Sequence, residues 1–324
     1  MLDYREPTQD DAEGEEPGLG TGPAPEIRCA RVTLAQHSQR LDKAVVALAP
    51  EFSRSHLQSL LEACHVQVDG VVSAVSSRRV RAGQMLRLEL VPTEESRAFR
   101  PQAMALDILF EDEHLLVVNK PAGLVVHPAP GNWSGTLLNG LLAHHAGAAM
   151  LPRAGIVHRL DKDTSGVMMV GKTLTAVTAM SRDIAARVVH RRYLALAQGV
   201  VAEGDFTVEA PIGRDPAVRV RMAVVVGGRA ARTDVHRVAV QGDISALSCT
   251  LHTGRTHQIR VHLAWKGHPL VADTLYGGKP QLGLQRQALH ATELRLAHPI
   301  SRAPMAFDCP PPCDFLVAWQ QVCG

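Results

Sequence analysis

Aromatic residues, cysteines and long apolar segments are all scarce in this 324-residue sequence. Aromatic side chains make up 4% of it, which disfavours a protein that stacks single-stranded nucleic acid on an aromatic platform. Six cysteines are too few in so long a chain for a disulfide framework, and they fit a reducing, cytoplasmic location. No apolar run approaches the roughly 20 residues of a membrane span and no secretory signal opens the sequence, so we expect no membrane association.

Sequence patterns of common metal and phosphate sites are also missing. There is no Gly-rich phosphate-binding loop. Cys309 and Cys313 lack the two-residue spacing and the second cysteine pair of a zinc ribbon. His252, His257 and His262 recur every five residues, a wider spacing than a metal site on a helix or hairpin requires. We therefore predict that the protein holds no metal ion.

The net charge of +2 hides an uneven distribution along the chain. Residues 1–26 carry eight acidic side chains and one basic side chain, a net charge of −7, which leaves +9 for the rest. A basic body favours an anionic partner, and nucleic acid is the first candidate. A soluble protein with a solvated basic surface explains the charge equally well.

Length and composition predict more than one domain. At the usual domain size, 324 residues correspond to two domains with some additional tail. Residues 1–37 are predicted as a disordered acidic tail and lead-in, and residues 38–95 as a small module. Residues 96–103 read as a polar linker, and residues 104–324 as a larger domain.

The small module combines helices, strands and basic side chains. Segments 40–48 and 53–64 have helical periodicity, followed by a strand that runs into an Asp-Gly turn and by a second strand near residues 80–90. The combined pattern resembles the S4 RNA-binding domain. This resemblance implies RNA contacts for basic residues of the module, among them Arg40, Lys43 and Arg54.

The larger domain is rich in strands. Apolar and polar residues alternate over 106–110, 218–222 and 247–251, whereas helical spacing is clear over 174–188 and 256–266. Many strands interrupted by few helices predict an α+β fold with a mixed, mostly antiparallel central sheet. The alternation over 218–222 would place Arg219 and Arg221 together on one cationic face.

The segment 155–166, Gly-Ile-Val-His-Arg-Leu-Asp-Lys-Asp-Thr-Ser-Gly, concentrates the charged chemistry of the sequence. It places Asp161 and Asp163 among cationic and hydroxyl side chains, on a loop before an apolar strand. Nearby cations keep a carboxylate ionised, as a nucleophile must be. A polar turn with capping residues would have the same composition. The two carboxylates also approximate the nucleophile motif of haloacid-dehalogenase-type phosphatases, which would require a parallel α/β frame and magnesium.

The string His-Arg-Leu-Asp-Lys-Asp-Thr-Ser-Gly at 158–166 is similar to the catalytic motif of the RluA-type pseudouridine synthases. Further blocks resemble other motifs of this family in the family's order: residues 108–132 with their Asn-Lys-Pro turn, 191–199, 253–263 and 286–299. With an S4-like module ahead of them, these blocks most resemble the RluD branch, whose members act on large-subunit ribosomal RNA.

The resemblance assigns roles to individual residues. It implies that Asp161 is the nucleophile, that Tyr193 packs on the target base with its hydroxyl placed for proton transfer, and that Arg260 pairs with the nucleophile. Arg159 would fill the space left by a flipped-out base, and Leu294 would line the base pocket. Taken without the resemblance, Tyr193 and Leu294 read as ordinary core residues.

The implied reaction converts uridine to pseudouridine in large-subunit ribosomal RNA, in an interface stem-loop. The isomerisation neither gains nor loses an atom, so we expect no cofactor. The implied partner is ribosomal RNA or the pre-ribosomal large subunit, bound by a monomer. Transfer RNA as the substrate, the phosphatase reading and a protein that binds RNA without turnover remain as alternatives.

Overall fold

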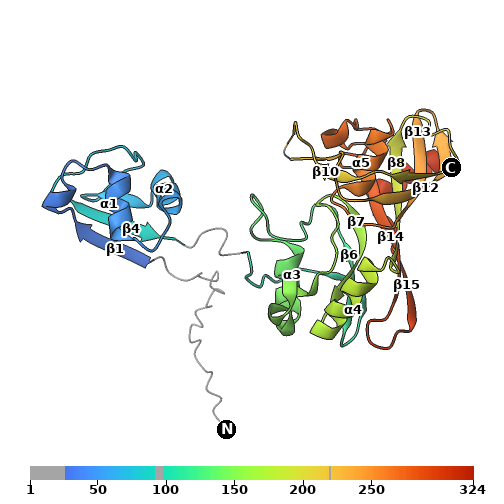
Figure 1. The fold of residues 1–324 in the computed structure, drawn as a ribbon, viewed down its shortest axis with the longest axis horizontal. Coiled ribbons are helices and arrows are strands. Elements are labelled where there is room, and N and C mark those ends of the chain that lie inside the picture. Colours follow the sequence, from blue (N-terminus) through green and yellow to red (C-terminus); the bar gives the residue numbers. More distant parts are fainter. Residues whose placement is uncertain (1–25, 92–97, 219) are drawn as a thin grey trace, which may run out of the picture. The chain divides into compact units, whose positions relative to one another are not determined.

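The computed structural model describes residues 26–91, 98–218 and 220–324 (Figure 1). Residues 1–25 of the predicted acidic tail, part of the predicted linker and Arg219 lie outside the described residues. The chain divides into two compact units, residues 1–93 and 94–324. Each unit has a hydrophobic core of its own.

The N-terminal unit is a four-stranded antiparallel sheet, in the order β1-β4-β2-β3, that packs against two helices. Asp69 and Gly70 join β2 to β3 with positive φ angles of 52° and 79°, as the predicted Asp-Gly hairpin turn requires. The elements are β1 (Glu26–Arg31), α1 (Leu41–Leu48), α2 (Arg54–Glu62), β2 (Val66–Val68), β3 (Val71–Val72) and β4 (Met85–Leu90).

One element of this unit differs from the prediction. Residues 26–31 were expected to belong to a disordered lead-in, but they form β1, which pairs along its whole length with β4. The strand is mostly exposed and has no regular alternation of buried side chains. It is held by backbone hydrogen bonds to its neighbour, which leave little trace in the pattern of side chains.

The C-terminal unit is built on one nine-stranded sheet. Its order is β5-β6-β7-β14-β8-β13-β12-β9, and β15 also pairs with β14. Among the strands of the described residues, β7 and β14 form the one parallel pair, which confirms the mixed, mostly antiparallel sheet. The parallel α/β frame of the phosphatase alternative does not occur here.

The elements of this unit are as follows. The sheet contains β5 (Asp107–Glu111), β6 (Leu115–Lys120), β7 (Ser165–Gly171), β8 (His190–Gln198), β9 (Asp205–Glu209), β12 (Arg232–Gln241), β13 (Ile244–Leu251), β14 (Leu289–Ala297) and β15 (Pro304–Asp308). A separate hairpin consists of β10 (Ile212–Arg214) and β11 (Met222–Val224). The helices are α3 (Leu137–His144), α4 (Leu174–Ala185), α5 (Gln258–Trp265) and α6 (Cys313–Cys323).

Helices cover both faces of this sheet. Along β8, Ala195 and Ala197 belong to the core that also contains residues of α3, α4 and α5, whereas Leu196 packs with residues of α6. Successive side chains of a strand point to opposite faces. Helix α6 therefore lies on the face opposite to the other three helices.

Two predicted helices are shorter than expected. Each has one end, the last residue of α4 and the first residue of α5, near a residue in the left-handed conformation. Helix α4 ends at Ala185, before Arg187 with a φ of 62°. Helix α5 begins at Gln258, because its N-cap His257 has a φ of 56°. Non-glycine residues in this conformation are uncommon and often mark functional sites.

The predicted cationic strand over 218–222 is also corrected. Strand β11 begins at Met222, and the preceding Arg221 forms an ion pair with the buried Asp215 instead of presenting a free cationic face. The acidic partner lies in the loop just after β10, which nothing in the local alternation indicates.

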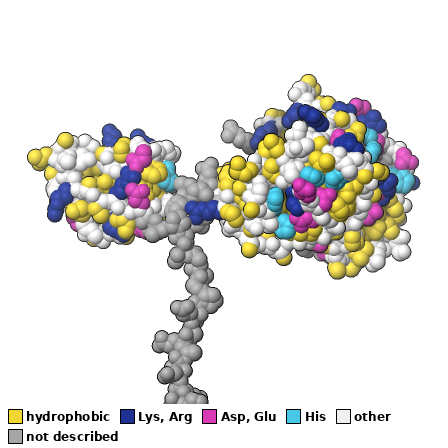
Figure 2. Space-filling model, turned by 90° about the horizontal axis from the view of Figure 1, so that it is seen from below, with side chains coloured by type: hydrophobic (Ala, Val, Ile, Leu, Met, Phe, Trp, Pro, Cys, Tyr) yellow, Lys and Arg dark blue, Asp and Glu magenta, His cyan; other side chains and the backbone are white. Residues whose placement is uncertain are grey.

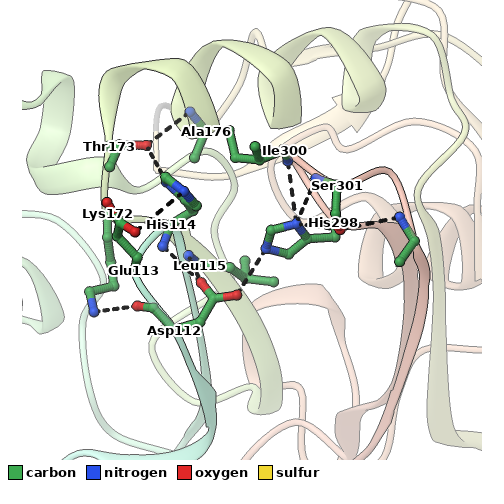
Figure 3. Close-up of polar contacts among 11 residues, drawn as sticks. Asp112, Glu113, His114, Leu115, Lys172, Thr173, Ala176, His298, Ile300 and Ser301 are labelled. Atoms are coloured by element: carbon green, nitrogen blue, oxygen red, sulfur yellow. Dashed lines mark hydrogen bonds and ion pairs between the residues drawn. The ribbon is translucent and has the colours of Figure 1, made fainter.

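A polar network joins two turns that lie far apart in the sequence (Figure 3). Asp112, after β5, accepts hydrogen bonds from the backbone N–H groups of His114 and Leu115, both at 2.7 Å. His298, after β14, lies with Nε2 2.9 Å from the second oxygen of Asp112. This contact ties the edge hairpin β5–β6 to the end of β14.

Candidate active site

The loop that carries Asp161 enters the middle of the sheet, immediately before β7. Gly166 lies in this strand beside Ala291 of β14, where a Cβ atom at position 166 would come 2.1 Å from the Ala291 carbonyl oxygen. Its φ of 118° is also unsuitable for other residues. Glycine at position 166 therefore permits the close parallel pairing that holds the loop beside β14.

Lys120 holds the backbone of this loop in place. Its side chain is 1% exposed, and Nζ donates to the carbonyl oxygens of Pro121, Leu124 and Lys162 at 2.8, 3.0 and 2.9 Å. Burial lowers the pKa of Lys120 to about 7, although the nearby carboxylates act to raise it. A bond from the ammonium group to Lys162 positions the backbone directly after Asp161.

Arg260 of α5 holds Asp161 on one side and a buried acid on the other. Nη1 donates to Asp161 Oδ2 at 3.0 Å, while Nε and Nη2 donate to the two carboxylate oxygens of Asp273 at 2.7 and 2.8 Å. Burial alone would lower the pKa of Arg260, but the bonds to Asp273 and the charge of Asp161 raise it above its ordinary value. The guanidinium therefore stays charged and keeps one fixed orientation.

His257 faces the other oxygen of the same carboxylate. Its Nε2 lies 3.9 Å from Asp161 Oδ1, and its Nδ1 lies 2.8 Å from the hydroxyl of Tyr276. The hydroxyl oxygen already accepts from the Met222 N–H, so its hydrogen can be donated to Nδ1, which leaves the ring hydrogen on Nε2. Burial lowers the pKa of His257 against the attraction of Asp161. A neutral N–H donor therefore points toward the carboxylate.

These groups open into a cavity of about 400 Å³, a size typical of small-ligand sites. Asp161, whose side chain is 15% exposed, lines it together with Tyr193, Arg260 and the exposed Arg159. Burial raises the pKa of Tyr193, and Asp161 raises it further against the influence of Arg191, so the hydroxyl stays protonated. Four residues predicted from the motifs thus meet at one cavity.

Leu294 does not line this cavity. It is 1% exposed and lies in the core, paired across the sheet with Arg191 and Phe307. The lining residue from the same strand is Leu289. Leu289 pairs with Ala195 and Leu294 with Arg191, which lie on one face of β8, so the position along β14 and not the face of the sheet decides which leucine lies at the cavity.

Two of the three basic residues predicted in the small module, Arg40 and Arg54, bind the carboxylate of Asp42. Arg40 and Arg54 donate to this buried carboxylate at 3.1 and 2.9 Å. Hydrogen bonding from Arg40 lowers the pKa of Asp42 to about 2, against the effect of burial. Lys43 is exposed and has no ion pair within the described residues. In Figure 2 basic side chains lie beside acidic ones on the visible face of this unit.

Several residues of the site carried no clear signal of their own in the sequence. Lys120 lies in segment 108–132, and Asp273 lies in 267–277, a further segment that resembles the turn downstream of the family's arginine motif. Neither similarity identified these two residues as functional. His257 was set aside as one of three evenly spaced histidines. In the structure the three have separate partners: Asp234 for His252, Tyr276 for His257, and Thr233 with Ala210 for His262.

Two kinds of feature are absent from the described residues. Within residues 26–91, 98–218 and 220–324, no group of three or more His, Cys, Asp or Glu side chains is placed to hold a metal ion. No helix of the described part of the chain is long and apolar enough to cross a membrane.

The chain is similar to proteins of known sequence over most of its length. A family model described as RNA pseudouridylate synthase matches residues 114–265. Ribosomal large subunit pseudouridine synthase D of Nitrosomonas europaea is 46% identical over 291 residues, which cover 87% of this chain and 84% of the relative. The protein of the same name from Escherichia coli O6:H1 is 43% identical over 300 residues, covering 89% and 91%.

A solved structure is similar to a large part of this chain. Human RNA pseudouridylate synthase domain containing 1 aligns with a TM-score of 0.51 and 28% sequence identity. The alignment covers 64% of this chain and 84% of the human chain.

Proposed function

The chain belongs to the RNA pseudouridylate synthase family, and from this premise we propose that it converts uridine to pseudouridine in large-subunit ribosomal RNA, at an interface stem-loop. The observation that carries the proposal is the carboxylate of Asp161, which opens into the cavity while Arg260 holds it from 3.0 Å. The printed names of the relatives favour ribosomal RNA over transfer RNA as the substrate.

Asp161 is the proposed nucleophile. Arg260 binds Oδ2 of the carboxylate, and this fixed contact leaves Oδ1 available to the substrate. Attack at the sugar carbon or at the pyrimidine ring would both start from this position. The N-glycosidic bond breaks, the uracil turns, C5 bonds to the same sugar carbon, and the bond between Asp161 and the substrate breaks again. One proton leaves C5 and one is taken up at N1, so no other reactant is needed.

Tyr193 is proposed to pack against the uracil and to relay protons through its hydroxyl. Its side chain lies on β8 at the cavity wall, and burial keeps the hydroxyl protonated at neutral pH. A protonated hydroxyl can donate a hydrogen bond to a uracil carbonyl. The ring also supplies an apolar surface for the base.

Arg159 is proposed to fill the space that a flipped uridine leaves in its stem. It lies two residues before the nucleophile, lines the cavity and is exposed to solvent. Its planar guanidinium can stack on a base and form hydrogen bonds at the same time. Removing a base from its stack costs a few kcal/mol, and a side chain that replaces it offsets part of that cost.

The N-terminal unit is proposed to be an S4 RNA-binding domain that adds phosphate contacts through Arg40, Lys43 and Arg54. Asp42 neutralises part of the charge of the two arginines, but it also fixes their orientation. Lys43 supplies a charge without an acidic partner in the described part of the chain.

The test is pseudouridine mapping of ribosomal RNA from cells that lack the gene, rescued with the wild-type chain or with Asp161→Asn. We expect marks that disappear in the deletion and return with the wild type alone. Persistence of every ribosomal mark would contradict the ribosomal target, and transfer RNA would then be mapped. Rescue by both chains would contradict the nucleophile assignment.

A further inference from the structure

Buried polar atoms without a partner are concentrated at the cavity. Among the described residues, four such atoms occur: His127 Nε2, His158 Nδ1, Arg191 Nε and Glu293 Oε2. The first three residues line the cavity, whereas Glu293 lies outside it and has ion pairs with Arg192 and Arg295. Buried polar groups in folded proteins are nearly always hydrogen-bonded. Their concentration at one cavity indicates that a polar ligand completes these bonds.

Arg191 differs from the two histidines because it carries a full charge. Burial, followed by the charge of Arg191, lowers the pKa of His158 to about 3, and burial lowers that of His127 to about 4. Both rings are therefore neutral and suit neutral groups of a ligand. Arg191 is 6% exposed, and its side chain has no ion pair with a described residue.

The surroundings of Arg191 are positive. Asp161 already pairs with Arg260, while Arg187 and Arg255 line the same cavity without an ion pair to any described carboxylate. Burial lowers the pKa of Arg255, and its neighbours Arg229 and Arg187 lower it further, which shows how closely like charges are gathered. An unpaired buried guanidinium is costly, and nearby cations add to that cost.

Space for the guanidinium depends on Gly254. A Cβ atom at position 254 would lie 3.0 Å from Arg191 Nη1, and the φ of Gly254 is outside the left-handed region. Glycine at position 254 therefore provides room for the guanidinium and is not required for its backbone conformation. An added methyl group would shift the guanidinium by a few tenths of an ångström without removing its charge.

We propose that Arg191 binds a phosphodiester group of the flipped nucleotide. This inference rests on the proposed function, because it names the part of the RNA that completes the cavity. The uracil and ribose are neutral, so among the groups of an RNA substrate the phosphodiester alone balances the buried charge. A guanidinium also matches the geometry of phosphate oxygens.

The experiment uses a stem-loop RNA that contains a mapped target uridine, with a neutral methylphosphonate placed at either linkage flanking that uridine. Binding is measured with the full chain carrying Asp161→Asn, with and without Arg191→Met. We expect Arg191→Met to weaken binding of the unmodified RNA by about 10- to 100-fold, the usual effect of a charge-assisted hydrogen bond. A methylphosphonate at one of the two linkages should weaken binding of the RNA by a similar factor. Arg191→Met should then weaken binding of that modified RNA only a little further. If Arg191→Met weakened binding of both modified RNAs by the same factor as binding of the unmodified RNA, the proposal would be overturned.

Matched variants separate binding from folding. Arg302→Gln removes an exposed arginine outside the cavity, paired with Asp183, and should change binding by less than about twofold. Gly254→Ala should weaken binding of the unmodified RNA but not of the RNA neutral at the linkage that Arg191 contacts. Arg191→Met should keep or raise the thermal midpoint of unfolding, since it removes an unpaired buried charge. A lower midpoint would indicate a structural role and overturn the proposal.

Different results would contradict the phosphate contact and the proposed reaction. If the chain without Asp161→Asn turns over the unmodified RNA but no linkage is coupled to Arg191, the phosphate contact is wrong and the proposed function stands. If one linkage is coupled to Arg191 but the chain gives no pseudouridine in any RNA, the contact stands and the proposed reaction is wrong.

Discussion

Arg260 Nη1 lies 3.0 Å from Asp161 Oδ2, although the two residues are 99 positions apart in the sequence. The remaining donors of the guanidinium bind Asp273, which is 2% exposed. One arginine thus neutralises a buried structural acid and orients the proposed nucleophile. Folding of the unit and assembly of the site are therefore linked through a single side chain.

Removing Arg260 should affect stability and turnover together. Arg260→Gln leaves Asp273 buried without its cation, so we expect the free energy of unfolding to fall by about 3–5 kcal/mol in urea titrations. The double variant Arg260→Met with Asp273→Leu should recover most of that stability without recovering turnover. If the double variant were active, the orienting role of Arg260 would be wrong.

Asp161→Asn should lower turnover by at least about 10³-fold, because an amide is not a nucleophile. RNA affinity should change by less than about threefold, since the amide keeps the shape of the carboxylate. Rates are measured by carbodiimide mapping of a ribosomal RNA transcript and affinities by filter binding. Asp163→Asn is the matched control two positions away, and it should retain most activity. Loss of activity in the control alone would reassign the nucleophile.

Arg159→Ala should lower turnover most on structured RNA. A stem-loop needs a side chain to fill the vacated stack, whereas an unstructured oligonucleotide does not. We expect turnover to fall about tenfold or more on the stem-loop and much less on the oligonucleotide. Equal losses on the two substrates would favour a simple phosphate contact.

Lys120→Met should loosen the loop that carries Asp161. The change leaves three partly buried carbonyl groups without the ammonium donor, which costs on the order of 3 kcal/mol. Turnover should fall while RNA affinity is largely kept, because the loop no longer holds the nucleophile in place. Lys172→Met removes another partly buried lysine, paired with Glu111, and serves as the comparison. An unchanged rate with Lys120→Met would exclude the positioning role.

The contact between Asp112 and His298 should make stability sensitive to acid. Burial alone would raise the pKa of Asp112, but bonds from the His114 and Leu115 N–H groups, and then from His298, lower it. An aspartate in the unfolded chain titrates near pH 3.9. A carboxyl whose pKa is lower in the folded state contributes stability above that value, and the contribution is lost as the pH falls through the folded pKa.

We therefore expect wild-type stability to fall more steeply than that of Asp112→Asn between about pH 5 and pH 3, measured by thermal unfolding. Glu113→Gln, at the exposed neighbouring position, should behave as the wild type. Parallel curves for the wild type and Asp112→Asn would contradict the lowered pKa.

The sequence by itself determined what depends on local order. Turn residues and periodicity predicted the two helices of the N-terminal unit, the Asp69-Gly70 hairpin and the mostly antiparallel sheet. The run of charged residues before β7 predicted the loop of Asp161. These features follow from the preferences of neighbouring residues, which are written directly in the sequence.

Only the tertiary structure decided which distant side chains share the cavity. Of the two leucines of β14, Leu289 lines the cavity and Leu294 is buried in the core, and β1 forms through backbone pairing that its side chains do not indicate. The sequence pattern of β8 likewise does not show that Arg191 is buried and unpaired, because this residue follows the same alternation as any core residue. Burial and missing partners are properties of the packed sheet, because they depend on what other segments bring to the same place.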